Sequence, residues 1–174
     1  MDARSGRETA ATEERTTIER ATERELVVTR TIDGPRNIVF EAWTDPELMK
    51  RWWVPRSIPI ALLSCDMDVR VGGTYRFVFQ ADPTTTMAFF GRYLEVDTPS
   101  RLVWTNEEGD GDAVVTTVTF DEDGGRTRVV VHDLYPSKEA LDEAIASEST
   151  PGWSEMLDQL DELLLELDGG SGRA

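Results

Sequence analysis

The sequence predicts an α+β fold in which a curved antiparallel sheet wraps around one long C-terminal helix. Residues 150–167 place apolar side chains at helical spacing and acidic side chains on the opposite face. Short alternating segments joined by turn residues fill the middle of the chain, as in an antiparallel meander. A sheet of that size must curl or be covered on one face, and the long helix is the available cover. The 174 residues suit a single domain with a sizeable core.

The first predicted elements are a strand over residues 25–33 and two short helices. Alternation in the segment ELVVTRTID indicates the strand, and Gly34-Pro35 ends it. Pro35 opens a helix that runs to Trp43. A second helix begins at Pro46, with Asp45 or Thr44 as its N-cap, and Val54-Pro55 ends it. This second helix carries a pair of tryptophans, Trp52 and Trp53, one of which we expect to be exposed and able to form a dimer contact.

Six further strands are predicted between the short helices and the C-terminal region. Gly91 marks a bulge or a close approach of two backbones, and the sequence DGG at 123–125 is a hairpin signal. Ser137 caps a short helix over 138–147 that turns Leu141, Ala144 and Ile145 inward. The predicted strands span residues 58–68, 74–81, 86–96, 101–106, 113–121 and 126–134.

The chain ends are predicted to lie outside the domain. Residues 1–22 mix charges with Thr, Ala and Gly and show no apolar period, which indicates a flexible N-terminal arm. The long helix should begin with Thr150 as N-cap and Pro151 at its first position, and end at Gly169 and Gly170. We therefore expect one domain over 23–168 and a flexible tail over 169–174.

Net charge and composition exclude several classes of partner. The formal charge of −16 argues against nucleic acid and against anionic membrane surfaces, because both recruit basic patches. No apolar run reaches the roughly 18–20 residues of a membrane span, and the first residues lack the apolar core of a secretory signal. Cys65 is the single cysteine, so no internal disulfide can form. We expect a cytoplasmic protein without membrane insertion.

Residues suited to catalysis are scarce in this sequence. The single histidine, His132, shares a strand face with Arg128 and Val130, which places it on the outer face if Val129 and Val131 point to the core. Cys65 has no histidine nearby in sequence and is expected to be a small buried residue. The sequence holds no metal-spaced set of His and Cys, and Gly72-Gly73 sits between strands as a hairpin turn. We expect no catalytic residue, no metal and no cofactor.

Aromatic residues are the most informative group, because they occur in almost every predicted element. They form either an ordinary core or the lining of a partly empty cavity between sheet and helix. Arg30, Arg70 and Arg76 are candidates to orient a carboxylate or phosphate there, or else they pair with acidic neighbours. The candidate ligand-binding residues are Trp43, Trp53, Tyr75, Phe77, Phe89, Tyr93, Trp104, Val118, Trp153, Met156, Leu157 and Leu160.

Several stretches together resemble one protein family. The sequence AWTDPEL at 42–48, followed by WWVP at 52–55, resembles the signature of bacterial proteins related to the activator of Hsp90 ATPase. These belong to the START-like or SRPBCC superfamily, and the resemblance implies its helix-grip (START/Bet v 1-like) fold. The resemblance spans roughly residues 24–167. Further matching stretches are DVRVGGTY at 68–75, GRYLEV at 91–96, RLVWT at 101–105 and the GW pair at 152–153.

The resemblance leaves three functions open. The first is non-catalytic binding of a small apolar or amphipathic ligand, such as a lipid, polyketide or aromatic metabolite. The second is contact with a chaperone or another protein partner, and the third is a cyclase-like or hydrolase-like enzyme of the same superfamily. Many relatives carry a histidine shortly before the GW pair, whereas this chain has none in Glu148–Pro151, which favours binding over catalysis. Either a monomer or a homodimer is compatible with the sequence.

Overall fold

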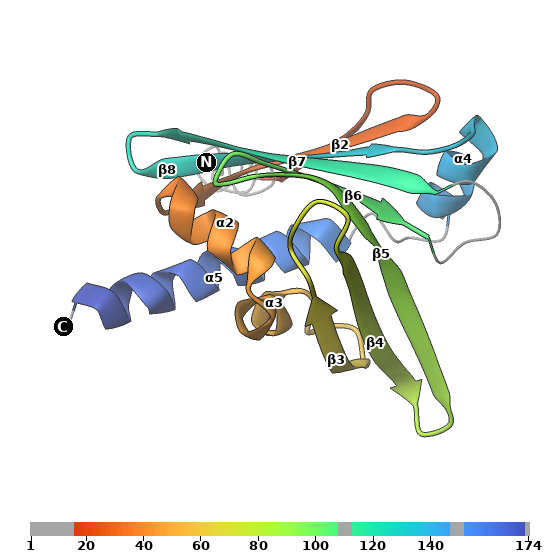
Figure 1. Cartoon of the computed structure of the whole chain (residues 1–174), viewed down its shortest axis with the longest axis horizontal. Helices are drawn as coiled ribbons and strands as arrows, with labels where there is room; N and C mark the ends of the chain where they lie inside the picture. Colours follow the sequence, from red (N-terminus) through yellow and green to blue (C-terminus); the bar gives the residue numbers. More distant parts are fainter. Residues whose placement is uncertain (1–15, 108–112, 147–151, 173–174) are drawn as a thin grey trace, which may run out of the picture.

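The computed structural model describes residues 16–107, 113–146 and 152–172, which form an eight-stranded antiparallel sheet and four helices. The strand order in the sheet is β1-β2-β8-β7-β6-β5-β4-β3, so every neighbour except β2–β8 is also a neighbour in sequence. Figure 1 shows the elements along the chain. They are β1 (Thr16–Arg20), β2 (Glu25–Asp33), α2 (Arg36–Thr44), α3 (Pro46–Trp52), β3 (Ala61–Met67), β4 (Thr74–Asp82), β5 (Thr85–Asp97), β6 (Arg101–Asn106), β7 (Val114–Asp123), β8 (Arg126–Leu134), α4 (Lys138–Ala146) and α5 (Gly152–Gly172).

Strand β2 turns its alternate side chains toward the helices, as its sequence pattern predicts. Leu26, Val28 and Ile32 are buried, while Thr31 and Asp33 on the opposite face are exposed. The strand is second from the edge of the sheet, where it pairs with β1 on one side and β8 on the other.

The N-terminal arm predicted over 1–22 is wrong for Thr16–Arg20. These residues form the edge strand β1, which pairs with β2 from Thr16↔Arg30 to Arg20↔Leu26. Of its five residues only Ile18 is apolar, and its other side chains are mostly exposed, so the segment has too little alternation to be recognised. Residues 1–15 lie outside the described residues.

Both short helices form where their sequences predict them, although α2 runs from Arg36 to Thr44, one residue later at each end than predicted. The Asp45 side chain accepts a hydrogen bond from the backbone N–H of Glu47, and Pro46 occupies the first turn of α3. The exposed tryptophan expected at the end of α3 is absent, because Trp52 is fully buried and its Nε1 donates to the carbonyl of Ala42 at 3.0 Å. Its neighbour Trp53 is partly buried and packs against the core.

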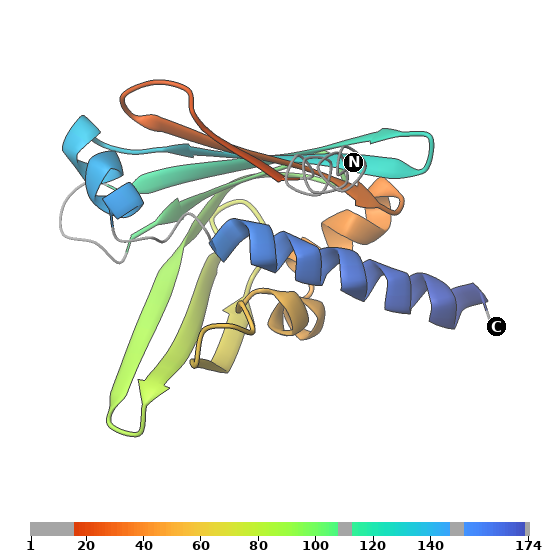
Figure 2. The same ribbon diagram turned by 180° about the vertical axis from the view of Figure 1, so that it is seen from behind.

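Helix α5 runs beneath the sheet, on the same side as α2 and α3 (Figure 2). Leu157, Leu160, Leu163 and Leu164 are buried against the sheet and the short helices. The helix continues to Gly172, so the tail predicted from residue 169 is wrong for 169–172. A helix adds one hydrogen bond for each residue that it extends, so its end need not coincide with the first glycine. Thr150 and Pro151 lie outside the described residues.

The remaining differences from the sequence prediction are small. Strand β3 begins at Ala61, three residues after the predicted start at Ile58. Ser137 caps α4 through its side-chain oxygen, which accepts from the N–H of Ala140, and Leu141 is buried as predicted. Ile145 was predicted to point inward but is exposed. In the described parts of the chain, no helix combines the length and the apolar character needed to cross a bilayer.

Candidate functional site

A cavity of about 370 Å³ lies between strands β4 to β6, the segment that links α3 to β3, and the first half of α5. This volume is at the lower end of the roughly 300–1,000 Å³ found for small-molecule sites. The described residues in its wall carry no formal charge. They are Trp43, Met49, Trp53, Val54, Pro55, Ile58, Ile60, Tyr75, Phe77, Phe79, Phe89, Tyr93, Trp104, Asn106, Trp153 and Met156.

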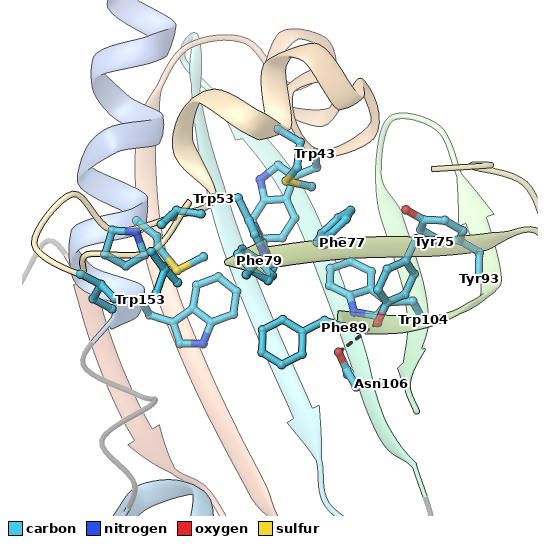
Figure 3. A pocket seen from close by; sticks show the side chains of 16 residues that line it. Trp43, Trp53, Tyr75, Phe77, Phe79, Phe89, Tyr93, Trp104, Asn106 and Trp153 are labelled. Atoms are coloured by element: carbon cyan, nitrogen blue, oxygen red, sulfur yellow. Dashed lines mark hydrogen bonds between the residues drawn. The ribbon is translucent and has the colours of Figure 1, made fainter. Parts of the chain in front are cut away.

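Aromatic rings form most of the cavity wall. Figure 3 shows Trp153 and Trp53 at one end and the rings of Tyr75, Tyr93 and Trp104 at the other. The ring of Trp53 stands edge-on to Trp153, with centroids 5.8 Å apart and an interplanar angle of 88°. The wall therefore presents both the faces and the edges of aromatic rings. These surfaces suit stacked and edge-to-face contacts with another aromatic ring better than contacts with a flexible aliphatic chain.

The cavity opens beside strand β5 and the segment before β3. Phe89 and Ile58 line the cavity, yet they are 39% and 41% exposed. Exposed apolar side chains at the mouth of a cavity are typical of ligand-binding grooves. The lining residues from α2 and α3, Trp43 and Met49, are buried, so the cavity deepens toward these helices.

Helix α5 holds the segment after α3 in place through one buried glutamine. The Gln159 side chain accepts from the backbone N–H of Arg56 at 2.8 Å and donates to the carbonyls of Trp52 and Val54 at 3.1 and 2.8 Å. At the outer edge, Glu155 accepts hydrogen bonds from the backbone N–H and the hydroxyl of Ser57. Together these contacts position the side chains that close one side of the cavity.

The polar end of the cavity is built from Asn106, the last residue of β6. Its Oδ1 lies 3.1 Å from the hydroxyl of Tyr75, and its Nδ2 donates to the carbonyl of Val114 at 3.2 Å and to Oγ1 of Thr116 at 2.9 Å. The Thr116 hydroxyl donates in turn to Oδ1 of Asp133 at 2.5 Å. A chain of hydrogen bonds therefore leads from the cavity wall to a buried carboxyl.

Burial controls the ionisation of the groups near this polar end. Burial raises the pKa of Asp133 to about 6, although the hydrogen bond from Thr116 opposes the shift. Burial also raises the pKa of Tyr135 to about 12, and the nearby charge of Asp133 adds to that rise. The pKa of Tyr93, in the cavity wall, is raised by burial as well. All three shifts favour the uncharged form of the side chain.

The structure brings most of the predicted ligand-binding residues together, including all of the aromatic ones. Those that line the cavity are Trp43, Trp53, Tyr75, Phe77, Phe89, Tyr93, Trp104, Trp153 and Met156. Val118, Leu157 and Leu160 do not line it, because each is fully buried in the packing between sheet and helices. Whether the lining residues bind a ligand stays a prediction.

None of the three arginines predicted to orient a ligand lies in the cavity wall. Arg30 is only 2% exposed and points at α5, where its guanidinium pairs with Asp158 and Asp161 at 2.7 Å each. Arg70 is exposed in the turn before β4 and pairs with Asp68 at 2.9 Å. Arg76 alternates with the inward-facing residues of β4 and is exposed on the outer face. Acidic partners hold Arg30 and Arg70 away from the cavity, and the alternation of side chains along β4 places Arg76 on the opposite face of the sheet.

Several lining residues were not predicted from the sequence. Phe79 follows Phe77 on the same face of β4, so strand alternation could have identified it. Asn106 had no sequence signal, because only the pairing of β6 with β7 brings it beside Thr116. The other unpredicted members are Met49, Val54, Pro55, Ile58 and Ile60.

His132 and Cys65 occupy the structural positions that the sequence predicts. Nε2 of His132 lies 2.5 Å from a carboxylate oxygen of Glu25 on the outer face, and this contact holds the pKa of Glu25 below its usual value. Cys65 is buried, and burial raises its thiol pKa to about 11. Among the described residues, no group of three or more His, Cys, Asp or Glu side chains could hold a metal ion.

Comparison with known proteins decides the family. The model of the family described as Activator of Hsp90 ATPase homolog 1-like protein matches residues 33–165. The chain belongs to this family. The family match falls within the stretch of residues 24–167 that carries the sequence resemblance, and the predicted helix-grip fold is confirmed. No curated protein matches the chain.

Solved structures of members of this fold extend over nearly the whole domain. A crystal structure from Nitrosomonas europaea is 26% identical, with a TM-score of 0.74 over 85% of this chain and 98% of that one. One from Rhodobacter sphaeroides is 22% identical, with a TM-score of 0.80 over 87% and 99%. An AHSA1-like protein from Aeromonas hydrophila is 22% identical, with a TM-score of 0.65 over 82% and 94%. The last two likenesses concern the fold alone.

Proposed function

We propose that this protein binds a small, uncharged aromatic ligand in the cavity between β4–β6 and α5. The observation that carries the proposal is the cavity of about 370 Å³, whose described lining is aromatic and aliphatic and whose mouth exposes Phe89 and Ile58. Pockets that bind small molecules have this combination of an apolar wall and a few polar groups. Family membership is compatible with this role, because members of the superfamily bind ligands or partners.

The electrostatics of the wall favour a neutral ligand over a fatty acid or a phosphate ester. Burying an unpaired charge in an apolar site costs several kcal/mol. The arginines that would have compensated an anion are occupied elsewhere, by Asp158 and Asp161 for Arg30 and by Asp68 for Arg70. The excess of acidic residues in the whole chain further disfavours an approaching anion.

A calorimetric titration with matched naphthalene probes tests the proposal. We expect 2-methoxynaphthalene to bind and 2-naphthoate, of similar shape but charged, to bind at least about tenfold more weakly. Met156→Trp fills the cavity and should weaken binding of the ether by at least about tenfold. Leu165→Trp is the matched control, since Leu165 is exposed on the same helix and away from the lining. Absence of binding, or equal binding by the Met156→Trp variant, contradicts the proposal.

A second candidate function is contact with a chaperone ATPase. The description of the family, Activator of Hsp90 ATPase homolog 1-like, favours it. Stimulation of ATP hydrolysis by a purified bacterial Hsp90-type chaperone, saturating with added protein, would support this role. An unchanged ATPase rate at saturating concentration, together with no complex in sedimentation, would contradict it.

A further inference from the structure

Asn106 is a polar side chain of the cavity wall whose amide nitrogen, but not its amide oxygen, has all of its hydrogen-bonding capacity used. Both hydrogens of its amide nitrogen are used, by the carbonyl of Val114 and by Oγ1 of Thr116. Its amide oxygen faces the hydroxyl of Tyr75 across 3.1 Å (Figure 3). The acceptor of this amide, and not its donor, is therefore presented toward the cavity end lined by aromatic rings.

The Tyr75 hydroxyl does not fully satisfy this oxygen. A phenol has one proton to donate. That hydroxyl also lies 2.7 Å from the carbonyl oxygen of Thr105, which can only accept, so the proton is directed at the shorter contact. A carbonyl oxygen has two lone pairs, so Oδ1 of Asn106 keeps acceptor capacity at the cavity wall.

The orientation of the amide is set from outside the cavity. Asp133 is buried in the sheet, and above its pKa its carboxylate can only accept hydrogen bonds. Thr116, also buried, must then donate its single proton to Asp133 and can only accept from Asn106. This direction of donation turns the nitrogen of Asn106 toward Thr116 and the oxygen toward the cavity.

We propose that Oδ1 of Asn106 accepts a hydrogen bond from a hydroxyl or N–H group of the ligand. The ligand class is then a neutral aromatic molecule with one hydrogen-bond donor, of the phenol or indole type, in preference to its O-alkylated or N-alkylated counterpart. Asn106 is the specificity residue, and Thr116 and Asp133 are positioning residues that fix its orientation. This inference rests on the proposed function of the cavity.

The test compares 2-naphthol with 2-methoxynaphthalene, which share a ring system and differ in the donor. Titrations are done near pH 8, where Asp133 is ionised and the phenol is neutral. We expect the wild-type protein to bind the phenol roughly fivefold more tightly than the ether, the ratio that one neutral hydrogen bond supplies. Asn106→Leu should bring this ratio to about one, whatever its effect on the affinity for the ether, because the acceptor that distinguishes the two probes is gone.

Two variants at Thr116 separate its effect on the orientation of the Asn106 amide from its effect on side-chain packing. Thr116→Val keeps the shape of the side chain but removes the hydroxyl that orders the amide, so the ratio of the two affinities should fall. Thr116→Ser keeps the hydroxyl and should restore the wild-type ratio. A purely structural role for Thr116 would change both affinities equally and leave their ratio unaltered. Circular dichroism of each variant confirms that it is folded before titration.

The possible failures are distinguishable. Equal affinity of the wild-type protein for phenol and ether, or an unchanged ratio in folded Asn106→Leu, overturns the role of Asn106 while the binding function stands. Binding of neither probe by the wild-type protein overturns both this inference and the proposed function.

Discussion

Asp133 is a residue whose ionisation opposes folding. Its carboxyl is buried next to Thr116, and burial raises its pKa from 3.8 to about 6. The folded chain therefore holds a proton on Asp133 more strongly than the unfolded chain does. Between these two pKa values the unfolded state binds fewer protons, so the free energy of unfolding falls as the pH rises through that window. The same buried acceptor that orders Thr116 thus destabilises the protein above pH 6.

Replacement of Asp133 by Asn should remove this pH-dependent loss. The amide oxygen still accepts from Thr116, but the side chain no longer ionises. A rise in pKa from 3.8 to about 6 corresponds to about 3 kcal/mol, so the variant should gain up to that amount relative to wild type between pH 4 and pH 8. Urea unfolding of both proteins across this pH range measures the gain. A difference in stability that does not change with pH would contradict the argument.

Among contacts between elements, two backbones approach closely where β5 runs beside β6. A side chain at Gly91 would place its Cβ 1.8 Å from the carbonyl oxygen of Thr105. That carbonyl also accepts the hydrogen bond from Tyr75, so this contact supports the polar end of the cavity. The predicted close approach at Gly91 is confirmed, and it explains why the strand has no side chain at this point.

Gly91→Ala should be strongly destabilising. The added methyl group meets backbone and not a flexible side chain, so we expect a loss of about 2–4 kcal/mol in the free energy of unfolding. Gly124→Ala is the control, because its positive φ of 63° costs about 1 kcal/mol but nothing lies within 4 Å of the new Cβ. Thermal and urea denaturation compare the two. Equal losses for both variants would show that the contact with Thr105 is easily relieved.

The link between α5 and the segment after α3 is a second contact between elements. Gln159→Leu leaves the N–H of Arg56 and the carbonyls of Trp52 and Val54 without their partner. Because three groups lose their partner and each unsatisfied buried group costs about 1–3 kcal/mol, we expect a loss of at least about 3 kcal/mol and weaker binding of 2-methoxynaphthalene. The control Glu166→Gln, which breaks the exposed ion pair with Arg51, should cost less than about 1 kcal/mol. A stable Gln159→Leu variant with wild-type affinity would contradict this role for Gln159.

For the whole molecule, the dominant property is an excess of negative charge. The chain has 34 acidic and 18 basic residues, for a formal charge of −16. This net value already counts every basic side chain, including those in ion pairs such as Arg30 with Asp158 and Asp161. Self-repulsion among the remaining carboxylates weakens the compact state, and dissolved salt screens this repulsion.

The melting temperature should therefore rise with ionic strength. We expect an increase of several degrees between about 0.05 M and about 0.5 M sodium chloride, because the Debye length falls well below the dimensions of the domain. Differential scanning calorimetry at fixed pH measures the shift, and potassium chloride serves as the control for specific cation binding. A melting temperature that falls with salt would mean that exposed ion pairs outweigh the repulsion.

The elements of this fold could be predicted from the sequence because their signals are local. Alternation identified β2, β4, β6 and β8 to within one residue of their ends, and capping residues such as Asp45 and Ser137 placed the short helices. The edge strand β1 was missed, because its five residues carry a single apolar side chain and are ordered by pairing with β2.

The order of the elements, the family and an aromatic-rich interior could all be predicted from residue type and spacing. The three-dimensional fold was needed to tell which of those side chains surround a cavity and which, like Leu157 and Leu160, fill the core. The fold also pairs Arg30 with Asp158 of α5, which lies 128 residues further along the chain. It aligns Asn106, Thr116 and Asp133 on three neighbouring strands. Contacts between segments far apart in the chain leave no periodic pattern in either segment, and they define the polar chemistry of this site.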